Sequence, residues 1–168
     1  MFSRLVQSSW LNLLLFVATV ASTFYVGAWI VDQSSSPALL STHDHPLRGW
    51  VFAIPLLGIL VTHELGHFVQ ARRHGVDASL PYFLPMPVPP LGTMGAVIIM
   101  RERIRTRNAL LDIGASGPWA GILVAIPVLC VGLRMSTLEP IADHGVDEGQ
   151  SLLYLLLKHL VLGPIPPG

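Results

Sequence analysis

Residues 58–75, GILVTHELGHFVQARRHG, place two histidines and a glutamate in a run that is otherwise apolar. His63, Glu64 and His67 form the pattern H-E-x-x-H. On a helix, side chains four positions apart lie on one face, so both imidazoles could bind the same Zn²⁺. A glutamate beside them could take a proton from a metal-bound water, whose pKa zinc lowers toward about 7. This is chemistry suited to amide hydrolysis.

The alternative is a helix end whose polar side chains simply reach water. Ionisable side chains inside a membrane helix cost several kcal/mol each unless they are paired or bound to metal. Three of them within five positions therefore favour a metal site.

The composition indicates that these residues lie in a membrane protein. Of the 168 residues, 52% are hydrophobic and 12% are charged, and the mean hydropathy is +0.61. A hydrocarbon core of about 30 Å needs roughly 20 apolar residues in a helix. We predict spans over residues 10–31, 49–73 and 109–133; the second reaches this length only if the helix continues through H-E-x-x-H. Residues 151–162 predict a shorter helix, interfacial or re-entrant.

The segment between the second and third spans is apolar but is not expected to be helical. Its run GTMGAVIIM, residues 92–100, has the β-branched content of a short strand. Apolar non-helical backbone is tolerated beside a membrane where it packs on protein or lines a wet cavity. We expect a loop folded back against the helices. The prolines that exclude a regular helix are Pro81, Pro85, Pro87, Pro89 and Pro90.

The fold prediction is an all-α polytopic membrane protein in which residues 1–168 form a single membrane-embedded domain. About three transmembrane helices are joined by the proline-rich re-entrant or β-like loop and followed by the short helix. The formal net charge is zero, which gives no reason to expect a nucleic-acid partner. The expected surroundings are the lipid bilayer, and no oligomeric state is predicted.

Basic residues near membrane spans tend to stay on the cytoplasmic side. Most of the arginines precede the first span or lie between the second and third, so we expect the N-terminus and the H-E-x-x-H end to be cytoplasmic. Segments 32–48 and 134–150 would then be outer loops, and His43 and His45 are interpreted as solvated loop histidines. The arginines on the cytoplasmic side are Arg4, Arg72, Arg73, Arg101, Arg103, Arg105 and Arg107.

Three motifs in order, THELGHFVQARRHG, PYFLPMPVPPLGTMGAVI and LLDIGASGPWAG, resemble the site-2 protease family of intramembrane zinc metalloproteases, peptidase family M50. The likeness is greatest to its bacterial and plastid branch, and the membrane that the resemblance implies is a bacterial cytoplasmic membrane. The resemblance implies that His63 and His67 are zinc ligands and that Glu64 is the general base. It also implies that residues 81–100 lie near the active site, where they could offer a strand edge to an unwound substrate. The alternative is an apolar plug that only seals the helices.

The third motif contains Asp112, for which two roles stay open. Asp112 could be a zinc ligand or an outer partner of the zinc site, or a helix-start residue whose charge suits the N-terminal dipole. Gly117 and Gly121 in the same motif form a small-xxx-small face that would allow close approach to the H-E-x-x-H helix.

A catalytic zinc usually has three protein ligands. The resemblance implies that the third is an aspartate in L-D-G or N-P-x-D-G on a later helix, and neither string occurs here. We therefore expect a C-terminally truncated member of the family, whose 168 residues alone bind zinc weakly and do not cleave. The acids that follow the third span fall in the expected outer loop: Glu139, Asp143, Asp147 and Glu148.

The function predicted is an intramembrane zinc metalloendopeptidase that cleaves membrane-spanning protein substrates near the cytoplasmic face. One alternative is a catalytically silent membrane scaffold that binds partner helices. The presence of Glu64 argues against it, because loss of this residue would be the obvious way to silence the enzyme. A metal transporter is a third possibility, but its ligands would be distributed over several helices, and the other spans offer few polar groups.

Overall fold

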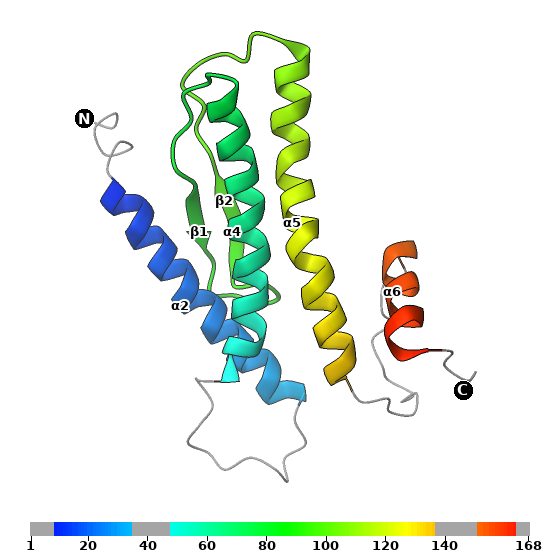
Figure 1. Cartoon of the computed structure of the whole chain (residues 1–168). Helices are drawn as coiled ribbons and strands as arrows, with labels where there is room; N and C mark the ends of the chain where they lie inside the picture. The colour runs from blue at the N-terminus through cyan, green and yellow to red at the C-terminus, as the bar shows by residue number, and fades with distance from the viewer. Residues whose placement is uncertain (1–8, 35–47, 137–150, 164–168) are drawn as a thin grey trace. The chain divides into compact units, whose positions relative to one another are not determined.

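The computed structural model describes residues 9–34, 48–136 and 151–163, and most of them are helical (Figure 1). Helices α2, α4 and α5 are each long and apolar enough to cross a membrane, so the three predicted spans are confirmed by length and composition. A two-stranded sheet and a short C-terminal helix complete the elements, as predicted. In chain order the elements are α2 (Ser9–Ser34), α4 (Trp50–Arg73), β1 (Tyr82–Pro85), β2 (Thr93–Val97), α5 (Arg107–Met135) and α6 (Leu152–Leu162).

Several expectations fall on residues outside these ranges. They concern the N-terminal residues before the first span and most of the two expected outer loops. The residues in question include His43 and His45, and the acids Glu139, Asp143, Asp147 and Glu148.

The described residues divide into two compact units, one up to Ile122 and one from Leu123 onward. Within the first unit, α2 and α4 approach each other at glycines. A Cβ on Gly27 would lie 2.7 Å from the carbonyl oxygen of Gly49 and 3.0 Å from Cβ of Phe52. Small residues allow this backbone-to-backbone packing, which holds membrane helices together where there is little hydrophobic driving force.

The strand predicted within residues 92–100 is confirmed as β2, and its partner is β1, whose pairing the sequence did not predict. The two strands are antiparallel, with Tyr82 opposite Val97 and Phe83 opposite Ala96. The register shifts between Phe83 and Pro85, where β1 ends. Proline is tolerated at such an irregularity because it has no amide hydrogen to donate to the ladder.

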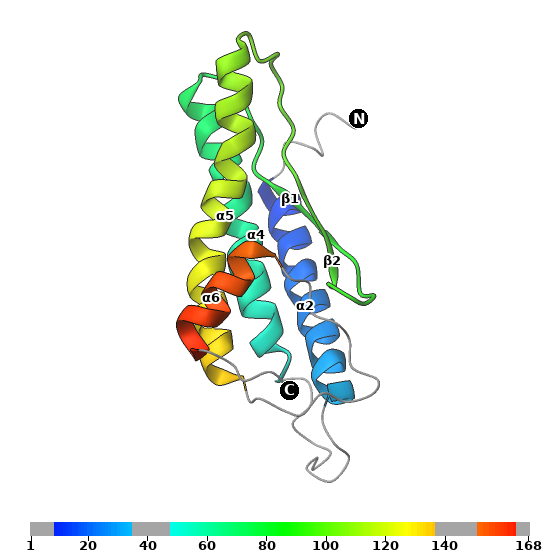
Figure 2. The same cartoon turned by 90° about the vertical axis from the view of Figure 1, so that its right-hand side faces the viewer.

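The hairpin lies along α2, and both views show the two strands beside that helix (Figures 1 and 2). Asn12 Nδ2 donates to the carbonyl oxygens of Leu80 (3.0 Å) and Pro81 (3.2 Å) at one end of the hairpin. Ser22 Oγ donates to the carbonyl oxygen of Gly92 (2.6 Å) at the other. Polar side chains of a membrane-spanning helix thus fix the strands that follow α4.

A small apolar cluster joins the end of α4, the base of the hairpin and the start of α5. It contains Ala71, Val76, Ala78 and Ile113, each no more than 6% exposed. The hairpin base is closed by backbone bonds, including Arg101 N to Asp77 O at 2.8 Å. This cluster fixes the position of α5 at Ile113 against α4, which matters for the site described below.

The second unit contains the rest of α5 and the helix α6. This helix covers the residues predicted to form the short helix, 151–162, to within one residue. Ser151 caps α6, since its side chain accepts a hydrogen bond from the backbone N–H of Tyr154 at 3.2 Å. Gly163 follows the helix with a φ of +76°, a conformation that glycine adopts readily.

Candidate active site

The two histidines of H-E-x-x-H point toward each other from successive turns of α4. Their Nε2 atoms are 3.1 Å apart, and the rings meet edge to face with centroids 4.8 Å apart. Two imidazole nitrogens bound to one tetrahedral zinc, each at about 2.0–2.1 Å, lie about 3.3 Å apart. The observed separation therefore fits a single Zn²⁺ held by His63 and His67.

The ring of His67 is oriented by the main chain of α5. Its Nδ1 lies 2.6 Å from the carbonyl oxygen of Ile113. A carbonyl oxygen can only accept, so Nδ1 carries the proton, and in a neutral imidazole Nε2 then presents its lone pair. A hydrogen bond from the second nitrogen of a metal-binding histidine typically fixes the tautomer and the ring orientation in this way.

Glu64 lies beside the histidines and is buried, with 8% of the residue exposed. It lines a cavity of about 330 Å³ together with His67. The same cavity is lined by Ala96, Ile98 and Met100, from β2 and the residues after it. Alternate residues of an extended strand share one face, so one apolar face of the hairpin borders the carboxylate.

Helix α5 packs against α4 through glycines on both helices. A Cβ on Gly66 would lie 2.6 Å from the carbonyl oxygen of Ser116, and a Cβ on Gly117 would overlap Nε2 of His67. A Cβ on Gly121 would lie 3.4 Å from Nδ1 of His63. The close approach expected from Gly117 and Gly121 is thus observed, and it occurs at the two histidines themselves.

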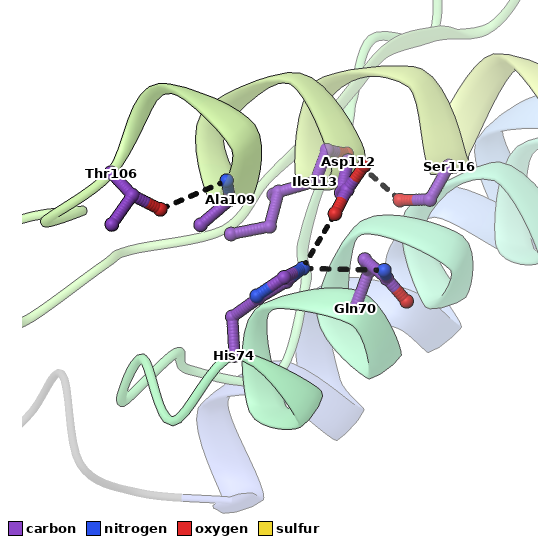
Figure 3. A network of polar contacts seen from close by, with 7 residues as sticks. All are labelled: Gln70, His74, Thr106, Ala109, Asp112, Ile113 and Ser116. Carbon is purple, nitrogen blue, oxygen red and sulfur yellow. Dashed lines mark hydrogen bonds and ion pairs between the residues drawn. The ribbon is translucent and has the colours of Figure 1, made fainter.

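Asp112 interacts with His74 at the end of α4. Its Oδ2 is 3.0 Å from Nε2 of His74, which in turn is 3.4 Å from Nε2 of Gln70 (Figure 3). In the part of the chain that the structure describes, no three His, Cys, Asp or Glu side chains gather as a metal-binding group. The structure therefore brings His63 and His67 together and places the carboxylate of Asp112 against another histidine.

Two contributors to the site had no signal in the sequence. The carbonyl of Ile113 acts through the main chain, which every residue type possesses, and only the packing of α5 on α4 brings it to His67. His74 is seven residues from His67, about 10 Å further along the helix, which is too far for the two to share a metal ion. It becomes an α4–α5 contact because Asp112 lies near the start of the next helix (Figure 3).

The model of peptidase family M50 matches residues 51–163, about two thirds of the chain. The chain belongs to peptidase family M50. The matched range starts within α4, so it includes the H-E-x-x-H turn and the hairpin but leaves α2 outside. No solved structure matches the chain.

The relatives found among curated proteins are plant metalloproteases. "Probable zinc metalloprotease EGY1, chloroplastic" of Arabidopsis thaliana is 39% identical over 106 residues, which are 61% of this chain and 19% of the relative. The protein of the same name from Oryza sativa subsp. japonica is 30% identical over 160 residues, 86% of this chain and 27% of the relative. "Probable zinc metalloprotease EGY2, chloroplastic" of Oryza sativa subsp. indica is 34% identical over 131 residues, 74% and 24% respectively. The chain thus spans about a quarter or less of the length of these relatives.

Proposed function

We propose that this chain provides the catalytic helices of a membrane zinc metalloendopeptidase whose substrates are membrane-spanning proteins. The observation that carries the proposal is the arrangement of His63, Glu64 and His67. Two Nε2 atoms lie 3.1 Å apart, and a buried carboxylate next to them borders a cavity. Membership of family M50 and the names of the plant relatives support the same chemistry.

His63 and His67 would hold the zinc, and Ile113 would keep the ring of His67 directed at it. Zinc, when bound, supplies a Lewis acid that activates water and polarises the scissile carbonyl. The carboxylate of Glu64 accepts a proton from the attacking water and later gives it to the leaving amine, a general base and acid in turn. Because Glu64 is buried, bulk water competes less for hydrogen bonds with its carboxylate.

The hairpin supplies a surface on which an extended substrate can lie. Its apolar face at Ala96, Ile98 and Met100 borders the same cavity as Glu64 and His67. A membrane-spanning helix satisfies its own amides, so it must unwind before a peptide bond can be attacked, and an extended peptide can then pair with a strand edge. The cavity between strand and carboxylate supports this role over that of a plug.

The proposed cleavage lies near the arginine-bearing end of the helices. His67 is six residues before the end of α4 at Arg73, which corresponds to about 9 Å along the helix. Following the tendency of arginines to stay inside, we propose that this end and the N-terminus face the cytoplasm of a bacterial cell. The plant relatives are named chloroplastic.

The test is cleavage of a single-span substrate by the full-length protein reconstituted in liposomes. Glu64→Gln keeps the shape of the side chain and removes its ability to take a proton, so the rate should fall by about 10²- to 10⁴-fold. Glu102→Gln, at an exposed glutamate, is the matched control and should cleave like the parent. Equal cleavage by Glu64→Gln would refute the proposed role, and a zinc-bound but inactive parent would favour the scaffold alternative.

A further inference from the structure

The chain carries its positive charge unevenly. Six of its ten basic residues lie between residues 72 and 107, a stretch that holds two acids, Asp77 and Glu102. All six are arginines. This stretch connects the end of α4 with the start of α5, two helices that are long and apolar enough to cross a membrane. The arginines therefore lie at or near the ends of these helices, where the hydrocarbon core of a membrane would meet water.

Two of the six arginines have partners within the protein. Arg72 Nη1 is 3.5 Å from one carboxylate oxygen of Asp77, and Arg101 Nη1 is 3.2 Å from the other. Asp77 thus pairs with both arginines, offsets one of their two positive charges and links them at the base of the hairpin. The other four make no ion pair with any residue that the structure describes, and all are exposed: Arg73, Arg103, Arg105 and Arg107.

Two of these unpaired arginines line a cavity. The space is about 450 Å³, and its polar lining comes from Arg103, Arg105, Thr106, His74 and Glu102. That volume is within the range of about 300–1,000 Å³ typical of small-molecule sites. Among the described residues that line the cavity, His74 interacts with Asp112 at 3.0 Å, so the guanidinium groups of Arg103 and Arg105 are the cations without an ion-pair partner. The carboxylate of Glu102 is the one acidic group in this lining.

The tendency of basic residues to stay on one side of a membrane explains why they lie near the span. It does not require that their side chains have any particular shape. Lysine and arginine both serve that purpose, and all the basic residues of this stretch are arginines, as are nine of the ten in the chain. A guanidinium presents a planar fork that matches phosphate oxygens with two parallel hydrogen bonds. Basic pockets between membrane helices are suited to lipid headgroups for this reason.

We propose that the cavity lined by Arg103 and Arg105 binds the phosphate of an anionic glycerophospholipid headgroup from the surrounding bilayer. The phosphate is recognised by the two guanidinium groups, and the acyl chains remain in the bilayer along the exposed apolar faces of α4 and α5. A bound lipid would rest at the junction of α4, the hairpin base and α5, close to the site but separate from it.

The test uses the full-length protein in nanodiscs, with phosphatidylglycerol titrated into phosphatidylcholine and retained lipid counted by native mass spectrometry. Each guanidinium–phosphate contact is a charge-assisted hydrogen bond that contributes at least about tenfold in affinity, so Arg103→Gln/Arg105→Gln should weaken phosphatidylglycerol retention by about 100-fold or more. The matched control, Arg73→Gln/Arg107→Gln, removes the same charge outside the cavity and should retain the lipid. Zinc content of both double variants checks that they are folded.

Two results would overturn the proposal. Equal loss of lipid in both double variants would mean that net charge alone attracts the lipid. Displacement of the bound lipid by millimolar inorganic phosphate or glycerol phosphate would mean that the cavity takes a soluble anion instead.

Discussion

Replacing Gly117 with alanine should damage the metal site although it changes no ligand. A Cβ at this position would overlap Nε2 of His67 and lie 2.5 Å from both Cδ2 and Cε1 of the ring. Carbon atoms that are not bonded approach to about 3.5 Å, so the ring would have to retreat by about 1 Å. The ring is not free to do so, because its Nδ1 is held 2.6 Å from the carbonyl oxygen of Ile113 on the same helix.

The size of the effect follows from the narrow range of distances that a zinc–nitrogen bond allows. Zinc–nitrogen distances stay within about 0.2 Å of 2.0–2.1 Å, so a shift of about 1 Å removes His67 as a ligand. Loss of a supporting hydrogen bond alone costs about 10- to 100-fold in affinity, and loss of the ligand should cost at least the upper value. Alanine is a better helix former than glycine by about 1 kcal/mol, so helix propensity cannot explain the loss.

The assay is zinc competition with a chelator on the detergent-purified, full-length protein. Two matched controls lie one turn away on the same helix. A Cβ on Gly114 would meet nothing within 4 Å, and one on Gly121 would lie 3.4 Å from Nδ1 of His63, so alanine at either position should leave zinc affinity nearly unchanged. If Gly117→Ala also bound zinc within about threefold of the parent, the inferred packing of α5 on His67 would be wrong.

Further predictions concern the polar contacts of the helices. Asn12→Leu removes the donor to the carbonyls of Leu80 and Pro81 and should lower the free energy of unfolding in mixed micelles by about 1–2 kcal/mol; an unchanged value would mean that the hairpin is held elsewhere. Asp112→Ala should leave zinc affinity within a few-fold of the parent, because the carboxylate interacts with His74 in an exposed pair of small energetic value. Abolished zinc binding in that variant would instead make Asp112 a ligand.

The sequence predicted the helices well because hydropathy over about 20 residues is a strong and local signal. The predicted spans 10–31, 49–73 and 109–133 correspond to α2, α4 and α5 within about two residues at each described boundary of the apolar runs. The strand in residues 92–100 was predictable from its β-branched composition. Its partner was not, because the prolines around β1 argued only against a helix.

The part of the site that consists of side chains with a known chemistry could be predicted from the sequence. The spacing of His63 and His67 was enough to predict that they share a face, and the structure brings their Nε2 atoms to 3.1 Å. The small-xxx-small pattern of Gly117 and Gly121 predicted that α5 approaches α4 closely, but not which atoms meet. Three features depend on that detail: the Ile113 carbonyl, the pairing of Asp112 with His74, and the contact of Gly117 with the ring. Polar anchoring of the hairpin by Asn12 was likewise visible only in three dimensions.

The most direct test of the account is the zinc content of the purified full-length protein measured by inductively coupled plasma mass spectrometry. We predict about one zinc per protein molecule in the parent and in His74→Ala, a control variant at the histidine that caps the C-terminal end of α4. We predict essentially none in His63→Ala and in His67→Ala. Retention of zinc by both of those variants, or its loss only in His74→Ala, would contradict the claim that H-E-x-x-H holds the metal.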